Sequence, residues 1–290
     1  WKQKFALGTN GQFGRTKSEQ LPLFKAAGFD GFFTSWNRDT DLKALAAQAR
    51  ELELEFQSVH APFHACDHLW ETPGQQGQDA LQELVECLRD SAEAGTDLVV
   101  AHAYIGFINH TPSQLGIDRY GVLVEEARRL GLRLALENTE GEEYLEALMN
   151  AFAQESHVGF CWDSGHECCY NPGWDFLRDY GDRLIMTDLN DNLGVEDPGG
   201  RLQSTDDLHL IPGDGIIGFV TKGFGVSIHR MDCPNAQNRT EPHQAARWVR
   251  THWANQEDQP FETTLELDCI TRDGLLLDVA TAMTTARVRV

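Results

Sequence analysis

Residues 95–138 read GTDLVVAHAYIGFINHTPSQLGIDRYGVLVEEARRLGLRLALEN, and this stretch decides the predicted fold. An apolar run at 97–101 predicts a strand, and a helical pattern at 122–130 ends at Gly131. A second apolar run follows at once, at 132–136. Both runs are apolar at consecutive positions, which is typical of strands that are buried on both faces of a parallel sheet. The stretch therefore predicts one strand–helix–strand unit.

The same unit recurs on both sides of this stretch. Strands are predicted at 5–8, 30–35, 56–59, 97–101, 132–136, 158–161 and 183–186, and helices at 18–27, 41–51, 77–94, 122–130 and 145–154. Seven strands without a reversal of chain order favour a closed barrel over a doubly wound sheet. We therefore predict an α/β fold, a TIM (β/α)8-like barrel whose eighth βα unit is atypical or incomplete and which carries an inserted β-hairpin.

Composition narrows the classes of partner. The chain has 290 residues and a net charge of −21. This charge argues against a nucleic-acid partner, because duplex binding draws its affinity from Lys and Arg. No run approaches the ~18 apolar residues of a membrane span, so we expect no membrane contact. The seven cysteines have no regular spacing, which predicts reduced thiols and a cytoplasmic location. The sequence leaves a homo-oligomer open.

Polar side chains follow most of the predicted strands. They are His60, His102, Glu137, Asn138, Asp163, His166, Asp188, Asp207 and His209, and Glu266 lies in a later apolar run. Each alone could be a hydrogen-bonded structural residue. In a β/α barrel, however, the carboxyl ends of the strands converge, and several carboxylates in one small volume repel one another. We therefore predict a divalent metal there, and mixed oxygen and nitrogen ligands suit Mn²⁺, Zn²⁺, Mg²⁺ or Co²⁺.

Four motifs carry a family resemblance over residues 1 to about 215. They are Val59-His60-Ala61-Pro62, Leu136-Glu137-Asn138-Thr139-Glu140-Gly141, Trp162-Asp163-Ser164-Gly165-His166, and Leu189-Asn190-Asp191-Asn192 with the later Asp207-Leu208-His209. In this order and spacing, the series resembles the xylose isomerase-like sugar phosphate isomerases and epimerases, whose wider relatives include endonuclease IV. In that family, His usually stands at the position of Asp188, so the metal preference of this chain is left open.

The resemblance implies roles for the candidate residues. The metal ligands would be Glu137, Asp163, Asp188, His209 and Glu266, and the substrate would contact His60, His102, Asn138, His166 and Asp207. Glu137 and Glu266 would also be the catalytic acid and base. They would move a proton next to a substrate carbonyl through a metal-stabilised enediolate.

The last quarter of the chain has a different character. Residues 216–235 predict a β-hairpin with a Gly-rich turn. Residues from about 213 to 290 resemble the C-terminal regulatory region of RelA/SpoT-type (p)ppGpp synthetase/hydrolases, first its zinc-finger-like part and then the start of its ACT domain. Half of the zinc ligands expected there are absent, so we do not expect an intact zinc finger. The chain therefore resembles a chimera.

We predict three segments and one leading function. Residues 1–215 would form the barrel, 216–260 the hairpin insertion, and 261–290 a βα unit that completes the barrel through Glu266. The leading function is a metal-dependent isomerase or epimerase of a small sugar or sugar phosphate. The alternatives are an endonuclease IV-like metal phosphodiesterase and a catalytically inactive fusion or regulatory binding module. The number of bound metal ions would separate the three.

Overall fold

The computed structural model describes most of the first 190 residues and little beyond them. The described residues are 4–190 apart from 10, 12, 13, 72, 108–110 and 172, then 192, 206, 207 and 209, and the backbone of 216–220, 226–230 and 248–250. Glu266 and the whole predicted segment 261–290 lie outside them, so the structure does not test that part of the prediction.

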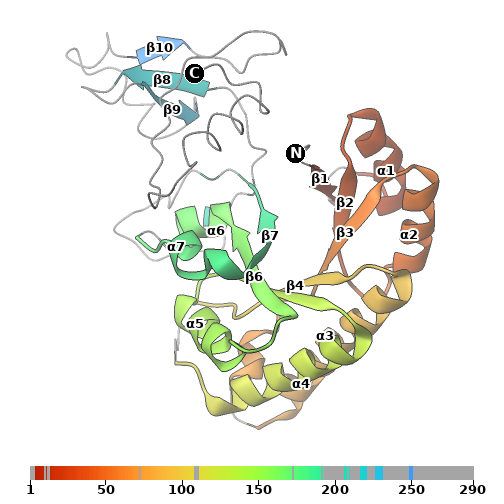
Figure 1. Cartoon of the computed structure of the whole chain (residues 1–290), viewed down its shortest axis with the longest axis vertical. Coiled ribbons are helices and arrows are strands. Elements are labelled where there is room, and N and C mark those ends of the chain that lie inside the picture. The colour runs from red at the N-terminus through yellow and green to blue at the C-terminus, as the bar shows by residue number, and fades with distance from the viewer. Residues whose placement is uncertain are drawn as a thin grey trace, which may run out of the picture. The chain divides into compact units, whose positions relative to one another are not determined.

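Seven parallel strands form a curved sheet in chain order, as predicted. The strands are β1 (Ala6–Gly8), β2 (Gly31–Ser35), β3 (Glu55–His60), β4 (Leu98–His102), β5 (Arg133–Glu137), β6 (Val158–Asp163) and β7 (Leu184–Asp188). Figure 1 shows them curling into a half-barrel with helices along its outer side. Within the described residues, β1 and β7 are the two edges of this sheet. The α/β barrel prediction is therefore confirmed.

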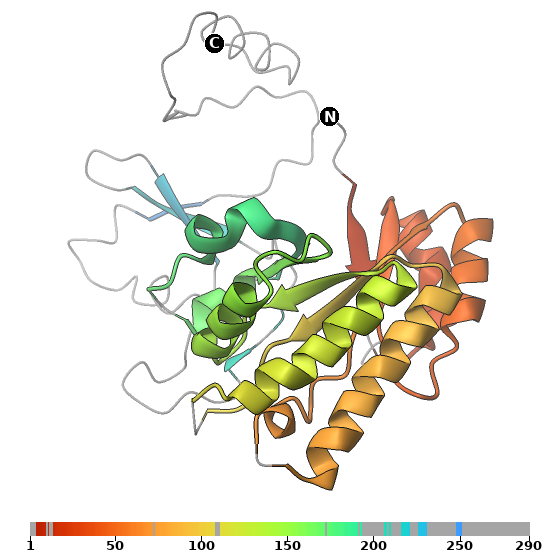
Figure 2. The same ribbon diagram turned by 60° about the horizontal axis from the view of Figure 1, so that its bottom comes forward.

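Helices alternate with the strands. They are α1 (Lys17–Ala26), α2 (Leu42–Glu51), α3 (Gln75–Ala94), α4 (Gln114–Leu130), α5 (Glu142–Ala151), α6 (Ser164–Cys169) and α7 (Phe176–Tyr180), with 3₁₀ turns η2 (Asp67–Leu69) and η3 (Gly181–Arg183). The turned view in Figure 2 shows α3 and α4 side by side on the outer face of the sheet. Both helices end at a glycine with a left-handed backbone, Gly95 at φ 87° and Gly131 at φ 73°, as the sequence predicts.

The helix α4 begins eight residues before its predicted start at Val122. Gly116 and Gly121 lie in its first half and weaken the apolar pattern there. The structure explains one of the two glycines. A Cβ at position 116 would lie 2.0 Å from the Trp70 ring, so only glycine lets the helix pack against this buried indole.

Side chains of the sheet alternate between two apolar layers. Val99, Leu134 and Phe160 pack with helix residues in the main core, outside the curved sheet. Their neighbours along the strands form a smaller cluster on the inner side. This inner cluster consists of Leu98, Val100, Ala135, Cys161 and Met186. Because both faces are apolar, these strands read as continuous hydrophobic runs.

A separate antiparallel sheet follows in the chain. It consists of β8 (Ile216–Val220), β9 (Val226–Arg230) and β10 (Trp248–Arg250), in the order β10–β8–β9. The predicted hairpin is confirmed by the antiparallel pairing of β8 and β9. None of the helices in the described part of the chain is both long and apolar enough to cross a membrane.

Candidate functional site

Five consecutive strands each end in a polar residue that could bind a metal or a substrate. The last residues of β3 to β7 are His60, His102, Glu137, Asp163 and Asp188. Four of these stand two positions after a member of the inner apolar cluster, for example Glu137 after Ala135. Because side chains two residues apart share a face of a strand, the four polar groups continue the inner layer upwards. These five strand-end residues form a polar layer at the carboxyl end of the half-barrel, the polar floor, which borders the apolar interior.

Three carboxylates converge on this floor. Glu137, Asp163 and Asp188 each offer an oxygen, and these atoms lie within 4.8 Å of one another. Asp163 is 0% exposed, and burial is the main cause that raises its pKa. Burial, followed by the charges of Glu137 and Asp163, raises the pKa of Asp188 to about 7. A divalent cation among the three groups would remove this conflict.

Two imidazoles hold one oxygen of Glu137. His60 Nδ1 lies 2.8 Å from the carbonyl oxygen of Ala61, and His60 Nε2 lies 3.0 Å from Glu137 Oε2. A carbonyl only accepts, so Nδ1 carries a proton, and a second proton on Nε2 makes the ring cationic. Burial opposes this charge, but the hydrogen bond and charge of Glu137 outweigh burial and raise the His60 pKa.

The second imidazole of this pair is neutral. His102 Nε2 lies 3.1 Å from the same Glu137 Oε2, and burial lowers the His102 pKa to about 4. Burial would raise the pKa of Glu137, yet His102 and His60 together hold it well below its ordinary range. The exposed ring of Phe63 stacks on His102 with centroids 4.5 Å apart. Glu137 is thus a buried, ionised group that a cationic ring and a neutral ring both fix.

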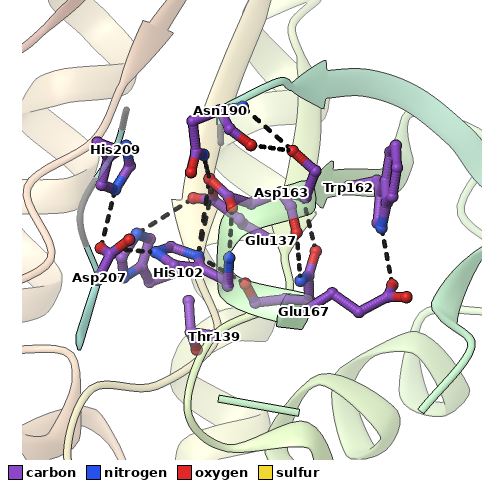
Figure 3. Close-up of polar contacts among 12 residues, drawn as sticks. His102, Glu137, Thr139, Trp162, Asp163, Glu167, Asn190, Asp207 and His209 are labelled. Carbon is purple, nitrogen blue, oxygen red and sulfur yellow. Dashed lines mark hydrogen bonds and ion pairs between the residues drawn. The ribbon is translucent and has the colours of Figure 1, made fainter. Parts of the chain in front are cut away.

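A second group of candidate metal ligands lies around Asp207. His166 Nε2 lies 3.1 Å and His209 Nε2 lies 2.8 Å from Asp207 Oδ2, as Figure 3 shows for His209. Burial opposes charge on His166, but Asp207, Asp163 and Glu137 outweigh it and raise its pKa to about 10. One donor atom from each of Asp163, His166 and His209 lies within 4.8 Å of the other two. Asp163 therefore belongs to two neighbouring groups of candidate ligands.

Asn138 supports the site from behind. Its Nδ2 donates to the Asp163 carbonyl oxygen at 2.9 Å, and its Oδ1 accepts from the Asp163 N–H at 2.8 Å. Its own carbonyl accepts from His166 Nδ1 at 2.9 Å. Asn138 is 0% exposed and supports Asp163 and His166, and its predicted contact with a substrate stays a prediction.

The comparison with known families agrees with this architecture. The sequence profile of the xylose isomerase-like TIM barrel matches residues 21–221, more than half of the chain. The chain belongs to this family. The xylose isomerase-like barrel is therefore the scaffold on which the site stands, as the sequence motifs predict.

Several solved structures share the fold. D-allulose 3-epimerase from Methylomonas sp. is 13% identical, with a TM-score of 0.54 over 71% of this chain and 78% of that chain. 3-Keto-D-glucoside 4-epimerase from E. coli is 21% identical, with a TM-score of 0.51 over 70% of this chain and 84% of that chain. A xylose isomerase-like TIM barrel/4-hydroxyphenylpyruvate dioxygenase fusion protein is 21% identical, with a TM-score of 0.52, and is matched over 66% of this chain and 32% of its own.

The C-terminal part of the chain matches a different family. The RelA/SpoT RIS domain profile covers residues 195–254. A probable GTP pyrophosphokinase from Mycobacterium leprae is 37% identical over 101 residues, which are 34% of this chain and 13% of that protein. The bifunctional (p)ppGpp synthase/hydrolase RelA from Mycobacterium tuberculosis is 36% identical over 103 residues, which are 34% of this chain and 14% of that protein. The chain thus spans about an eighth of these relatives' length, and it joins parts of two families.

The structure brings most of the predicted site residues together. Nine of the ten lie at the carboxyl end of the half-barrel or are bonded to residues there: His60, His102, Glu137, Asn138, Asp163, His166, Asp188, Asp207 and His209. The tenth, Glu266, lies outside the described residues. Sequence reasoning missed Asn190, whose Nδ2 donates to Asp163 Oδ2 at 2.8 Å, because the loop after β7 holds several similar amides and acids.

Proposed function

We propose that this chain is a divalent-metal-dependent isomerase or epimerase of a small sugar or sugar phosphate. The observation that carries the proposal is the convergence of the Glu137, Asp163 and Asp188 carboxylates at the ends of three adjacent strands. Membership in the xylose isomerase-like family supports the same reaction class, and so do the epimerases among the similar structures.

The donor set fits a divalent cation. Three carboxylates face one another, and two of the three have raised pKa values even though His166 Nδ1 lies 3.9 Å from Asp163 Oδ2 and 4.0 Å from Glu137 Oε1. Two buried polar atoms close by, His102 Nδ1 and Asp207 Oδ1, have no hydrogen-bond partner in the described part of the chain. Oxygen-rich sites with adjoining imidazoles suit Mn²⁺, Mg²⁺, Co²⁺ or Zn²⁺. When bound, the cation polarises a substrate carbonyl and stabilises negative charge on its oxygen.

The protein's own groups divide the remaining work. Asp163, Asp188 and Glu137 would hold the cation, and His209, whose side chain is 50% exposed, would be a further ligand beside Asp163. Glu137 would serve as a ligand and, as the family resemblance implies, as one of the two proton-transfer groups. The imidazoles of His60 and His102 keep it ionised.

The second proton-transfer group must come from elsewhere, and we assign this role to Glu266. It lies in the predicted strand 263–268, and we propose that this strand pairs as the eighth strand with β1 and β7, which are the sheet edges within the described residues. In that place, Glu266 would complete the ring of carboxylates. One of the pair Glu266 and Glu137 would take the proton from the carbon next to the carbonyl, and the other would return a proton to the opposite face; return to the neighbouring carbon on the same face needs only one of the two.

Solvent deuterium exchange tests this proposal. The full chain, loaded with Mn²⁺, is incubated in D₂O with a panel of ketoses and aldoses, and NMR follows deuterium at the carbon next to the carbonyl. The proposal expects exchange that stops with EDTA and that falls by about 10²–10⁴-fold in Glu266→Gln. The exposed Glu53→Gln serves as the matched control. Exchange that is equal in the wild type and in Glu266→Gln contradicts the assignment of the base.

The grouping of the candidate metal ligands favours a second possible function, that of a metal phosphodiesterase. The candidate ligands fall into three adjoining groups that share Glu137 and Asp163, namely His60/His102/Glu137, Glu137/Asp163/Asp188 and Asp163/His166/His209. Such an arrangement could hold more than one ion, as a metal phosphodiesterase requires. Inductively coupled plasma mass spectrometry distinguishes the candidates. One ion per chain supports the isomerase, two or three support the phosphodiesterase, and none supports an inactive fusion.

A further inference from the structure

Asp163 is fixed more completely than its neighbours on the polar floor. The side chain of Asn138, just after β5, hydrogen-bonds to both the backbone N–H and the carbonyl of Asp163, at 2.8 Å and 2.9 Å. Asp163 Oδ1 accepts from the backbone N–H of His166 at 2.7 Å, and this bond caps the short helix α6. These three bonds fix the backbone and one carboxylate oxygen. The second oxygen, Oδ2, lies 3.9 Å from His166 Nδ1, and its hydrogen bond within the described residues comes from the β7 side.

Asn190 makes that contact. Its Nδ2 donates to Asp163 Oδ2 at 2.8 Å, and Figure 3 shows the amide facing the carboxylate from the end of β7. The Asn190 backbone is anchored in turn, because Ser164 Oγ donates to its carbonyl at 2.7 Å and accepts from its N–H at 3.1 Å. The chain after β7 is therefore tied to the start of α6 through three hydrogen bonds.

The glycine at position 165 leaves room for this amide. A Cβ at Gly165 would lie 1.8 Å from Asn190 Oδ1 and 2.8 Å from its Cγ. Contacts this short do not occur, so any larger residue at 165 would displace the Asn190 side chain. Asn190 Oδ1 is buried and has no hydrogen-bond partner within the described residues. Within the described residues, the hydrogen bond of this amide is therefore made by its Nδ2, which donates to Asp163.

We propose that Asn190 is a positioning residue, which aims the Asp163 carboxylate at the bound cation, and that Gly165 is required because it admits the Asn190 amide. This inference rests on the proposed function, since it takes Asp163 as a metal ligand. Hydrogen bonds that orient a ligating carboxylate commonly change metal affinity by about 10–100-fold when they are removed. The same magnitude is expected for Asn190 and, through it, for Gly165.

Calorimetric titration of Mn²⁺ into the EDTA-treated, dialysed full chain at pH 7.5 tests the inference. Asn190→Ala and Gly165→Ala are each expected to weaken Mn²⁺ binding by about 10–100-fold. The double variant should bind no more weakly than Asn190→Ala alone, because both changes remove the same bond. Asn150→Ala, at an exposed position, and Gly121→Ala, whose added Cβ would meet nothing within 4 Å, are the matched controls and should bind as the wild type does.

The outcomes separate this inference from the proposed function. A wild-type chain that binds no Mn²⁺ overturns the metal site and the inference with it. A wild type that binds Mn²⁺, together with an Asn190→Ala variant of equal affinity, overturns the inference alone. A lower melting temperature with unchanged Mn²⁺ affinity reports a merely structural role and also overturns it. If Gly165→Ala fails to fold, Asn190→Ala alone decides the outcome.

Discussion

Replacing Asp188 with asparagine is expected to stabilise the metal-free protein and to remove its response to divalent cations. An Asp188 oxygen lies within 4.8 Å of oxygens of Glu137 and Asp163, and burial with these charges raises the Asp188 pKa from 3.8 to about 7. A change of this size makes ionised Asp188 about 4 kcal/mol less favourable in the fold than in the unfolded chain. Asparagine removes the charge but keeps a buried polar group, so about 2 kcal/mol of stability should be regained.

The pH dependence has a definite sign. Because the folded pKa of Asp188 lies above its unfolded value, the penalty is absent well below pH 3.8, grows as the pH rises and is complete above about 7. In EDTA at pH 8, Asp188→Asn should therefore melt about 4–8 °C above the wild type. At pH 5 the difference in melting temperature between Asp188→Asn and the wild type should shrink to less than half of its value at pH 8. Thermal unfolding followed by circular dichroism measures both differences.

Addition of Mn²⁺ completes the test of Asp188. It should raise the melting temperature of the wild type at pH 8 and leave that of Asp188→Asn nearly unchanged, since the variant lacks one of three carboxylates. The exposed Asp182→Asn on η3 is the matched control and should behave as the wild type in every condition. A variant that is no more stable than the wild type at pH 8 in EDTA, or that responds equally to Mn²⁺, would refute the reasoning.

Three further substitutions test other parts of the structure. His60→Ala leaves the buried charge of Glu137 without its cationic partner, so urea denaturation at pH 7 should show a loss of about 3–5 kcal/mol; a loss below 1 kcal/mol would contradict the ion pair. Phe160→Ala, at a position that is 0% exposed, should lose about 3–5 kcal/mol in the same assay, and an unchanged midpoint would contradict the two-layer core. Gly95→Ala forces a side chain onto a backbone at φ 87°, and a loss of about 1–2 kcal/mol is expected, whereas no loss would contradict the left-handed cap.

The order of the seven strands and of α1 to α5 could be predicted from the sequence, because apolar runs mark the strands and Gly28, Gly95 and Gly131 follow three of the helices. The short helices α6 and α7 were not predicted. The ends of the strands could not be predicted as well. The predicted strand 158–161 stops at Cys161, whereas β6 continues to Asp163. The predicted strand 132–136 stops before Glu137, which is the last residue of β5. A polar residue ends an apolar run in the sequence. The backbone pairing of the strand nevertheless continues through that residue, because its side chain contacts other polar residues of the site.

The chemistry of the site could be predicted only in part. The convergence of strand-end carboxylates and imidazoles follows from parallel topology, and the structure brings those residues together. The hydrogen bonds among them depend on rotamers and on contacts between distant segments. The Asn190 amide meets Gly165 across 25 positions of the chain, and no spacing rule pairs them. The contacts of the two imidazoles with Glu137 are likewise visible only in three dimensions.

Glu137, Asp163 and Asp188 are proposed to form a divalent-cation site. A crystal of the full chain soaked in Mn²⁺, with an anomalous difference map calculated at a wavelength where Mn²⁺ scatters anomalously, tests it most directly. We expect a peak at coordination distance from an oxygen of each of the three carboxylates, and no such peak in Asp163→Asn. A map without a peak there, or with its Mn²⁺ only at the acidic group of Asp67, His68 and Glu71 beside η2, would contradict it.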